Sequence, residues 1–331
     1  MSLLEVKDLT TSIVTRRGTV HAVQGVSFGV ERGSSVCVVG ESGSGKSVMA
    51  RSIIRLLPRE ARIVSGSVVF DGTDLRTLPE KRLEDLRGMR IGMLFQDPMS
   101  CLNPVLTIGT QITETIRRHL RVPRAEAYKR AVELLGEVRI DNAERRMADY
   151  PHQYSGGMRQ RVMLAIALSC DPDLLIADEP TTALDVTVQA RILDLLEDLR
   201  QARGLALLLI THDMRIVERV ADQVLVMYAG QIVESGKRKD VLGSPQHPYT
   251  EALLGAVPDI DDSGARTSRL TAIPGSPPDL TATLAGCRFA PRCGYARLDD
   301  GCASAEVELR AVGAGHLVRS CHPAIAREAK G

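Results

Sequence analysis

The stretch GESGSGKS at residues 40–47 directly follows an apolar run, VCVV at 36–39, and leads into VMARSIIRLL at 48–57. Four of its residues fit the pattern G-x-x-x-x-G-K-[ST] of a phosphate-binding loop, namely Gly40, Gly45, Lys46 and Ser47. Glycines allow successive backbone N–H groups to point inward around phosphates, and the N-terminus of the next helix adds a favourable dipole. A loop of this kind between a buried strand and a helix predicts an α/β nucleotide-binding fold.

Three further apolar runs have the character of that first strand: IGMLF at 91–95, LLIA at 174–177 and LALLLI at 205–210. Continuous apolarity is typical of parallel strands that are buried on both faces. Each run is followed directly by polar residues, which are Gln96, then Asp178-Glu179, then Thr211-His212-Asp213. Ligands of open α/β sheets bind outside the carboxyl ends of the strands. We therefore expect these residues to converge with the phosphate loop.

These residue types suit the chemistry of a nucleoside triphosphate. Lys46 would reach the β- and γ-phosphates, and the Ser47 hydroxyl would ligate Mg²⁺. Asp178 ends a strand and suits a Mg²⁺ partner, directly or through water. Glu179 follows it and can take a proton from the attacking water or orient that water. The sequence therefore predicts a nucleoside triphosphatase.

Composition narrows the class of protein. The chain has 331 residues, of which 44% are hydrophobic and 25% charged, with a net charge of +1. Balanced charge argues against an extended nucleic-acid-binding face, and the absence of Trp with only four Phe and six Tyr argues against base-stacking platforms. The start, MSLLEVKDL, lacks the features of a signal peptide, and the apolar runs are too short to span a bilayer. A cytosolic protein is expected, with any membrane link made through another protein.

The seven cysteines fall into two groups. Three of them are scattered and are expected to be ordinary small apolar side chains: Cys37, Cys101 and Cys170. The other four lie within the last 45 residues: Cys287, Cys293, Cys302 and Cys321. In a cytosolic chain such a group favours a metal site over disulfides. The spacings lack the C-x2-C knuckle of ordinary zinc sites, so spacing alone leaves metal binding and four unligated thiols equally open.

A further stretch, YSGGMRQR at 154–161, is more specific than the phosphate loop, because a phosphate loop occurs in many NTPases. With it, the chain resembles the ATP-binding subunits of ABC transporters over nearly its whole length. The matching motifs, in chain order, are the phosphate loop, Gln96 of the Q-loop, the signature Ser155-Gly156-Gly157, the pair Asp178-Glu179, the D-loop ending at Asp185, and the switch histidine His212.

The resemblance implies that two such subunits close head to tail, with ATP between the phosphate loop of one and the signature of the other. It implies that Glu179, His212 and Gln96 act in hydrolysis, and that Mg²⁺ is held by Ser47, Gln96 and Asp178. The nucleotide would contact Gly40, Glu41, Ser42, Gly43, Ser44, Gly45, Lys46, Ser47 and Val48. The partner's ATP would meet Tyr154, Ser155, Gly156, Gly157, Met158 and Gln160. Ile13 stands where this family usually stacks adenine on an aromatic ring.

The fold class implied is α/β: a P-loop NTPase (RecA-like) core with an N-terminal antiparallel β-subdomain, a helical insert subdomain and a small C-terminal cysteine-rich metal-binding tail. The expected ranges are 1–258 for the nucleotide-binding domain, with the helical insert at about 97–170, then a linker at 259–285 and the cysteine region at 286–331. Antiparallel strands are expected in 1–35 and 63–78, and an amphipathic crossover helix in 187–203, ending at Gly204.

Further stretches look like the oligopeptide and dipeptide importer branch: FQDPMSCLNP at 95–104, SPQHPYTEALLGAVP at 244–258, IPGSPPDL at 273–280 and GCRFAPRCGYA at 286–296. The resemblance implies the first of the two ATPases of such an importer, on the cytoplasmic face of the cell membrane. Its partners would be a second ATP-binding subunit, two transmembrane permeases and an extracytoplasmic peptide-binding protein, with no nucleic acid. The alternatives are an importer of nickel or another small solute and, from another class, a soluble ABC ATPase that acts on nucleic acid or ribosomes.

For the cysteine tail, the resemblance implies four ligands of a [4Fe–4S] cluster, with zinc as the alternative. Four thiolates suit such a cluster. His316 and His322 are interpreted as ordinary surface histidines rather than ligands. Nothing in the sequence places the tail near the nucleotide, so a structural or redox-sensing role is expected.

Overall fold

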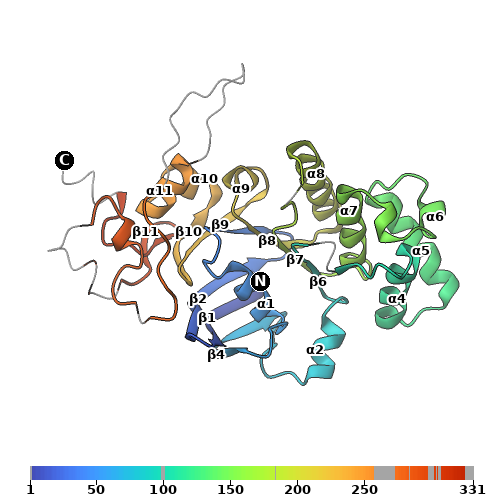
Figure 1. Cartoon of the computed structure of the whole chain (residues 1–331), viewed down its shortest axis with the longest axis horizontal. Coiled ribbons are helices and arrows are strands. Elements are labelled where there is room, and N and C mark those ends of the chain that lie inside the picture. The colour runs from blue at the N-terminus through green and yellow to red at the C-terminus, as the bar shows by residue number, and fades with distance from the viewer. Residues whose placement is uncertain are drawn as a thin grey trace, which may run out of the picture. The chain divides into compact units, whose positions relative to one another are not determined.

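The computed structural model describes residues 2–97, 101–182, 184–256, 273–282, 284–296, 302, 304 and 307–324. The chain forms two compact units, each built from separated segments (Figure 1). Unit 1 comprises Met1–Leu4, Val30–Ser35 and Phe70–Ile210, and unit 2 comprises Glu5–Gly29, Val36–Val69 and Thr211–Gly331. The predicted limits at 258 and 285 remain a prediction, because such units need not coincide with sequence domains. Residues 259–272 of the predicted linker lie outside the described part.

Unit 1 is organised around parallel strands. β6 (Ile91–Leu94) pairs with β7 (Leu174–Asp178), and β7 pairs with β8 (Ala206–Thr211), in register with Leu94 opposite Ala177 and Asp178 opposite Ile210. Every residue of β7 is buried, as the continuous apolar run predicted. The crossover helix α8 (Val186–Arg203) buries Ile192, Leu193, Leu195, Leu196 and Leu199. It ends at Gly204, whose φ of 61° is the left-handed conformation that glycine adopts readily.

Helices lie between β6 and β7, in the range where the helical insert was predicted. Among the described residues they include α4 (Ile108–Leu120), α5 (Arg124–Glu137), α6 (Ala143–Arg146), the 3-10 turn η1 (Pro151–Gln153) and α7 (Gly156–Ala167). α4 and α5 pack on each other and on α7, as Figure 1 shows. Before β6 lie the short strand β5 (Thr73–Asp74) and the helix α2 (Glu80–Leu86).

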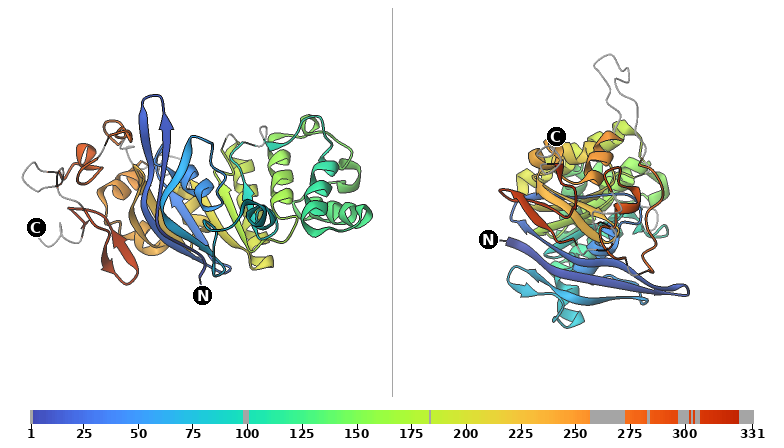
Figure 2. Two further views of the ribbon diagram at one scale, coloured as in Figure 1. Left: turned by 90° about the horizontal axis from the view of Figure 1, so that it is seen from below. Right: turned by 90° about the vertical axis from the view of Figure 1, so that its left-hand side faces the viewer.

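Unit 2 contains two sheets. β1 (Ser2–Thr15) lies between β2 (Gly18–Glu31) and β4 (Ala61–Phe70), and the two long blue strands β1 and β2 run side by side in Figure 2. Turns at residues 16–17 and 71–72 mark strand boundaries, and β1 and β2 each run for 14 residues. The second sheet joins β3 (Ser35–Val39) in parallel to β9 (Gln223–Tyr228) and continues antiparallel through β10 (Gln231–Lys237). Its helices are α1 (Lys46–Ile53), α9 (Met214–Val220), α10 (Arg238–Gly243) and α11 (Pro248–Gly255).

The cysteine region packs into unit 2. β12 (His316–Val318) pairs with β10, and β11 (Arg310–Gly313) pairs with β12. His316 Nε2 lies 2.7 Å from the buried Glu234 Oε1, and that carboxylate also accepts the backbone N–H groups of Gln246 and His247. The interpretation of His316 as a surface histidine was therefore wrong, because the residue is 7% exposed and ties the C-terminal hairpin to β10.

Among the described helices, none has the length and apolar content that crossing a membrane requires.

Candidate nucleotide site

The phosphate loop of unit 2 is shaped by close backbone contacts. A Cβ on Gly40 would lie 2.1 Å from the carbonyl oxygen of Met227, and one on Gly45 would lie 2.1 Å from that of Ala22. Neither carbonyl can move away easily, because both belong to paired strands. Gly45 also has a φ of 101°, which an L side chain rarely adopts. The two glycines of the motif are therefore required by space and conformation.

Lys46 lies folded within this loop. Its side chain is 4% exposed, and Nζ donates to the carbonyl oxygens of Gly40 at 2.7 Å and Glu41 at 2.8 Å. Ser44 Oγ lies 3.4 Å from the same nitrogen. The ammonium group therefore stands at the centre of the loop, at the first turn of α1, where an anion would meet both its charge and the helix N-terminus.

The other predicted nucleotide residues vary in exposure. Ser42 and Gly43 are exposed, Ser44 is buried, and Ser47 and Val48 are half-buried on α1. Ile13 is half-buried on β1. His212, which directly follows β8, is exposed and belongs to the same unit as the phosphate loop.

Unit 1 holds the carboxylates at the carboxyl end of β7. Asp178 is fully buried as the last residue of the strand. Glu179 has a φ of 47°, and its backbone N–H donates to the carbonyl oxygen of Ile210 at 2.9 Å. Its Oε2 accepts hydrogen bonds from Gln96 Nε2 and from Thr182 Oγ1, both at 3.0 Å. The predicted convergence of Gln96 with Glu179 is therefore present, and the unusual φ at Glu179 is a strained conformation of the kind found at functional sites.

The signature forms the N-terminus of α7. Ser155 is the N-cap, and its Oγ accepts the backbone N–H of Met158 at 3.4 Å. Ser155 and Gly156 are exposed, whereas Tyr154 and Gln160 are each 2% exposed. The Tyr154 hydroxyl donates to the Arg146 carbonyl oxygen at 2.9 Å, and burial raises the pKa of Tyr154 to about 12. Of the predicted signature residues, Ser155 and Gly156 are therefore accessible to another molecule, whereas Tyr154 and Gln160 are buried within the chain.

Asp185 starts the next helix in the same way. Its Oδ1 accepts the backbone N–H of Val188 at 2.9 Å, which makes it the N-cap of α8. Val188 then meets the signature: a Cβ on Gly157 would lie 2.6 Å from Val188 Cγ1. The signature therefore packs against the first turn of α8, and a Cβ on Gly156 would lie 3.5 Å from Leu184 of the D-loop.

Comparison with known proteins agrees with this geometry. Residues 23–182 match the ABC transporter family, and residues 233–302 match the oligopeptide/dipeptide transporter C-terminal region. The chain is 52% identical over 295 residues to the probable peptide ABC transporter ATP-binding protein y4tR of Sinorhizobium fredii, covering 89% of this chain and 88% of that protein. It is 50% identical over 295 residues to the oligopeptide transport ATP-binding protein OppD of Bacillus subtilis, covering 89% and 82%. The chain belongs to the ATP-binding subunits of ABC transporters.

Solved structures agree with this assignment. The dimeric ATP-binding cassette MJ0796, in a post-hydrolysis state bound to ADP and phosphate, superimposes with a TM-score of 0.64 at 28% identity, covering 71% of this chain and 98% of that one. The P-loop NTPase fold predicted from the sequence is therefore confirmed. The chain is an ABC ATPase, in which hydrolysis of ATP is coupled to transport.

Three residues for which the sequence suggests no role support this ABC ATPase site. Thr182 donates to Glu179, as described above. Tyr249 Oη accepts the backbone N–H of Glu41 at 2.8 Å, and Arg292 forms a two-bond ion pair with the Glu41 carboxylate. Tyr249 and Arg292 lie in the stretches 244–258 and 286–296, whose composition marked the branch without indicating what each side chain contacts.

In the described part of the cysteine tail, the thiols do not form a recognisable metal site. Cys287 N–H donates to the Cys302 carbonyl oxygen at 2.7 Å, and Cys302 Sγ lies 3.2 Å from His322 Nε2. Burial raises the pKa of the Cys287 thiol, and the charges of Cys293 and Cys302 add to this. Within the described residues, which include all four cysteines, no group of three or more His, Cys, Asp or Glu is placed to hold a metal ion. As placed, the thiols do not fit the expected metal-binding tail. Cys101 is exposed, contrary to its expected apolar role.

Proposed function

We propose that this ABC ATPase powers the import of di- or oligopeptides. The observation that carries the proposal is the match of residues 233–302 to the oligopeptide/dipeptide transporter C-terminal region, a segment outside the general ABC match. The test is transport of labelled di- and oligopeptides into vesicles that contain the assembled transporter, with nickel uptake measured in parallel. Peptide uptake that requires ATP supports the proposal, and nickel uptake without peptide uptake contradicts it.

In the proposed reaction, the triphosphate lies on the phosphate loop, where Lys46 neutralises β- and γ-phosphate charge. Ser47, Gln96 and Asp178 would hold Mg²⁺, which supplies charge stabilisation to the phosphoryl group when it is bound. Glu179 would take the proton of the attacking water, since its carboxylate is already oriented by Gln96 and Thr182. His212 would bond the γ-phosphate, and Ile13 would contact adenine by apolar packing in place of a stacked ring.

A second ATP-binding subunit would complete each site. The exposed N-terminus of α7, with Ser155 and Gly156, offers unpaired helix N–H groups that suit a γ-phosphate carried by another chain. The isolated chain should therefore hydrolyse ATP slowly, with a turnover that rises with protein concentration as subunits meet. Turnover measured across a dilution series checks this. A constant, high rate per subunit at every dilution contradicts the shared site.

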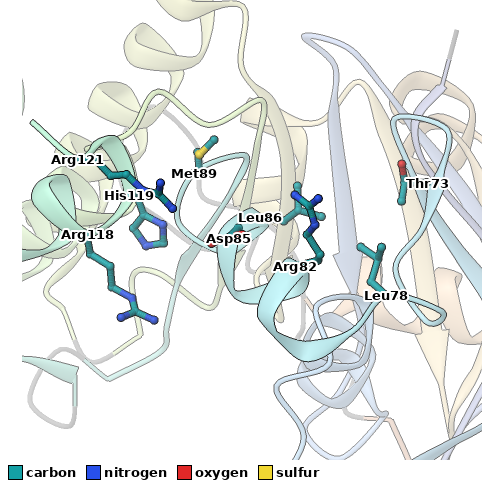
Figure 3. A pocket seen from close by; sticks show the side chains of 9 residues that line it. All are labelled: Thr73, Leu78, Arg82, Asp85, Leu86, Met89, Arg118, His119 and Arg121. Atoms are coloured by element: carbon teal, nitrogen blue, oxygen red, sulfur yellow. The ribbon is translucent and has the colours of Figure 1, made fainter.

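Two membrane permeases would dock on unit 1, on the cytoplasmic face of the membrane, with an extracytoplasmic peptide-binding protein delivering the substrate. A pocket of about 480 Å³ suits the docking of a short permease segment (Figure 3). It lies between α2 and the end of α4 and is lined by Thr73, Leu78, Arg82, Asp85, Leu86, Met89, Arg118, His119 and Arg121. Three arginines against one aspartate, beside the 38% exposed Met89, favour a segment that is both apolar and acidic.

A charge reversal at this pocket tests the docking site. Arg82→Glu should reduce co-purification of the permeases without changing ATP binding by the isolated chain. Lys129→Glu is the matched control, because Lys129 is exposed on α5 away from the pocket lining. Equal loss of the permeases in both variants, or no loss in Arg82→Glu, contradicts docking at the pocket.

For the tail, we propose a [4Fe–4S] cluster on Cys287, Cys293, Cys302 and Cys321. Four thiolates are the usual ligands of such a cluster, and a backbone hydrogen bond from Cys287 to Cys302 places two of the four residues side by side. The thiols would have to move closer on binding. Metal analysis and visible absorption of anaerobically prepared protein decide the matter. Iron and sulfide in the protein would support the cluster. Zinc without iron would show that the site holds the alternative ion, and the absence of any metal would contradict a metal site.

A further inference from the structure

One arginine of the cysteine region reaches the phosphate loop. Arg292 ends the 3-10 turn η2 (Ala290–Arg292), directly before Cys293. Its Nη1 donates to Glu41 Oε2 at 2.7 Å and its Nη2 to Glu41 Oε1 at 3.0 Å. The expectation that nothing places the tail near the nucleotide was therefore wrong, because Glu41 is the second residue of the loop GESGSGKS.

Two further donors of this guanidinium are also engaged. Arg292 Nε donates to the Pro274 carbonyl oxygen at 2.7 Å, and Nη1 lies 3.2 Å from the Tyr228 hydroxyl. The guanidinium carbon lies over the rings of Tyr228 and Phe289, 5.8 and 5.9 Å from their centroids. The Arg292 side chain is 4% exposed and that of Glu41 is 25% exposed. The ion pair between Arg292 and Glu41 is largely shielded from solvent and held by several hydrogen bonds, so its geometry is fixed.

Glu41 is held at its backbone as well. Its N–H donates to the buried Tyr249 hydroxyl at 2.8 Å, and its carbonyl oxygen accepts from Lys46 Nζ at 2.8 Å. A shift of Glu41 would therefore shift one of the oxygens that orient the Lys46 ammonium. The carboxylate also has an electrostatic effect, because a negative charge in an anion-binding loop opposes the binding of phosphate unless a cation compensates it.

We infer that Arg292 is a positioning residue for the phosphate loop: it fixes Glu41 and compensates its charge, so that the C-terminal cysteine segment sets the affinity for MgATP. This inference rests on the proposed role of the loop in binding ATP. The raised pKa of Arg292, caused first by its hydrogen bonds to Glu41, keeps the cation charged throughout the working range of pH.

The same segment offers a matched control. Arg288 is also buried and also anchors the segment, donating to the Ala229 carbonyl oxygen and, at 2.5 Å, to Gln24 Oε1. These hydrogen bonds reach Ala229 and Gln24, which lie outside the phosphate loop. If Arg292 only docks the tail, removing either arginine should have the same consequence for nucleotide binding.

The experiment measures the Kd for MgATP of the full chain in five variants. Arg292→Gln should raise Kd about tenfold, because it leaves the Glu41 carboxylate uncompensated. Glu41→Gln should change Kd less than about threefold, and the double variant Arg292→Gln/Glu41→Gln should return close to the Glu41→Gln value. Arg288→Gln should leave Kd unchanged while increasing hydrogen exchange in 287–296. Arg292→Lys, which keeps the charge but loses the two-bond geometry, should lie between wild type and Arg292→Gln.

Each outcome decides between the readings. Non-additivity in the double variant, together with an unchanged Kd in Arg288→Gln, supports the inference. Equal weakening by Arg288→Gln and Arg292→Gln, or a double variant as weak as Arg292→Gln alone, overturns it in favour of simple docking. In the assembled transporter, Arg292→Gln should raise the KM for ATP without lowering kcat. Lys46→Ala separates the two proposals. If the Lys46→Ala chain still binds ATP, the proposed role of the phosphate loop is wrong. If Lys46→Ala abolishes ATP binding while Arg292→Gln leaves Kd unchanged, only the present inference is wrong.

Discussion

The phosphate loop and the signature are built alike but held differently. Each is a glycine-rich turn with serine at the N-terminus of a helix. In the phosphate loop, two glycines face carbonyl oxygens of unit 2 at distances that exclude a Cβ, and the lysine is buried. In the signature, Ser155 and Gly156 are exposed, and a Cβ on Gly156 would meet only Leu184 at 3.5 Å.

The two loops differ in the segments that contact them. The phosphate loop takes its shape from contacts within its own unit, from β2, β9, α11 and the C-terminal segment. The signature is held by its own unit at Tyr154, Gly157 and Gln160, whereas Ser155 and Gly156 are exposed. The contacts of this chain therefore account for the geometry of the phosphate loop, whereas the signature presents Ser155 and Gly156 to the outside, where the proposed second subunit would meet them.

The largest effect is expected at the closed loop. Lys46→Ala removes the only ammonium group at its centre among the described loop residues, so ATP turnover of the assembled transporter should fall by about a thousandfold, with weaker ATP binding. Lys7→Ala, at an exposed lysine paired with Glu5, is the control and should leave turnover unchanged. Turnover at the wild-type rate in Lys46→Ala would remove the phosphate loop from the reaction.

Glu179→Gln should separate binding from hydrolysis. The amide can still accept from Gln96 and Thr182, but it cannot take the proton of the attacking water, so kcat should fall by about 10²- to 10⁴-fold while ATP binding persists. Size-exclusion chromatography with MgATP should show the chain held in a larger, ATP-dependent assembly. Glu133→Gln, on the exposed face of α5, serves as the matched control. Hydrolysis as fast as in the wild type would exclude Glu179 as the catalytic carboxylate.

Gly157→Ala probes how the open loop is supported. The new methyl group would press on Val188 Cγ1, 2.6 Å away, and displace the N-terminus of α7. Turnover of the transporter should fall about ten- to a hundredfold, since small displacements near a reacting centre have effects of that size. ATP binding to the isolated chain should not change, because the phosphate loop is untouched.

Val188→Ala supplies the rescue for this variant. In the Gly157→Ala/Val188→Ala chain the clash is relieved, and turnover should recover. Gly136→Ala, at a helix position where nothing lies within 4 Å of the added carbon, should resemble the wild type. A double variant that stays as slow as Gly157→Ala would show that the methyl group acts on something other than Val188.

Tyr154→Phe should have the smallest effect. It removes the hydrogen bond to the Arg146 carbonyl oxygen, while the guanidinium of Arg146, 5.6 Å from the ring centroid, keeps its contact. The free energy of unfolding should fall by about 1 kcal/mol, as a lowered midpoint in denaturant. With a pKa of about 12 the hydroxyl stays protonated at working pH, so the difference from wild type should be constant between pH 6 and 9. A pH-dependent difference would mean that Tyr154 titrates.

The core of the fold could be predicted because its signals are local. Each buried strand is a continuous apolar run, the crossover helix carries its own periodicity and ends at Gly204, and the phosphate loop is a contiguous motif. The convergence of Gln96 with Glu179 followed from the rule that parallel strands end at one edge. The segments 1–35 and 63–78 were correctly assigned as strands, although only the structure shows that β1 and β2 run for 14 residues each.

What escaped prediction depends on contacts between distant segments. No local pattern shows that Arg292 meets Glu41 or that His316 meets Glu234, because these pairs are separated by 251 and 82 positions. The burial of Tyr154 and Gln160 could not be predicted for a related reason, because the residue types of a motif do not show which of its side chains face inward. The arrangement of the four thiols could not be predicted either, because the spacing of cysteines along the chain does not determine the distances between them in the fold.

The long separation of Arg292 from Glu41 also orders events during synthesis. Residue 41 emerges 251 residues before the arginine that compensates it, which is roughly 13 to 50 s at ordinary rates of translation. The loop also lies against the carbonyl oxygen of Met227 at Gly40, so it cannot take its final shape until β9 and the cysteine segment have both been made. If Arg292 compensates Glu41 as inferred, full affinity for nucleotide is expected only once that arginine has joined the fold.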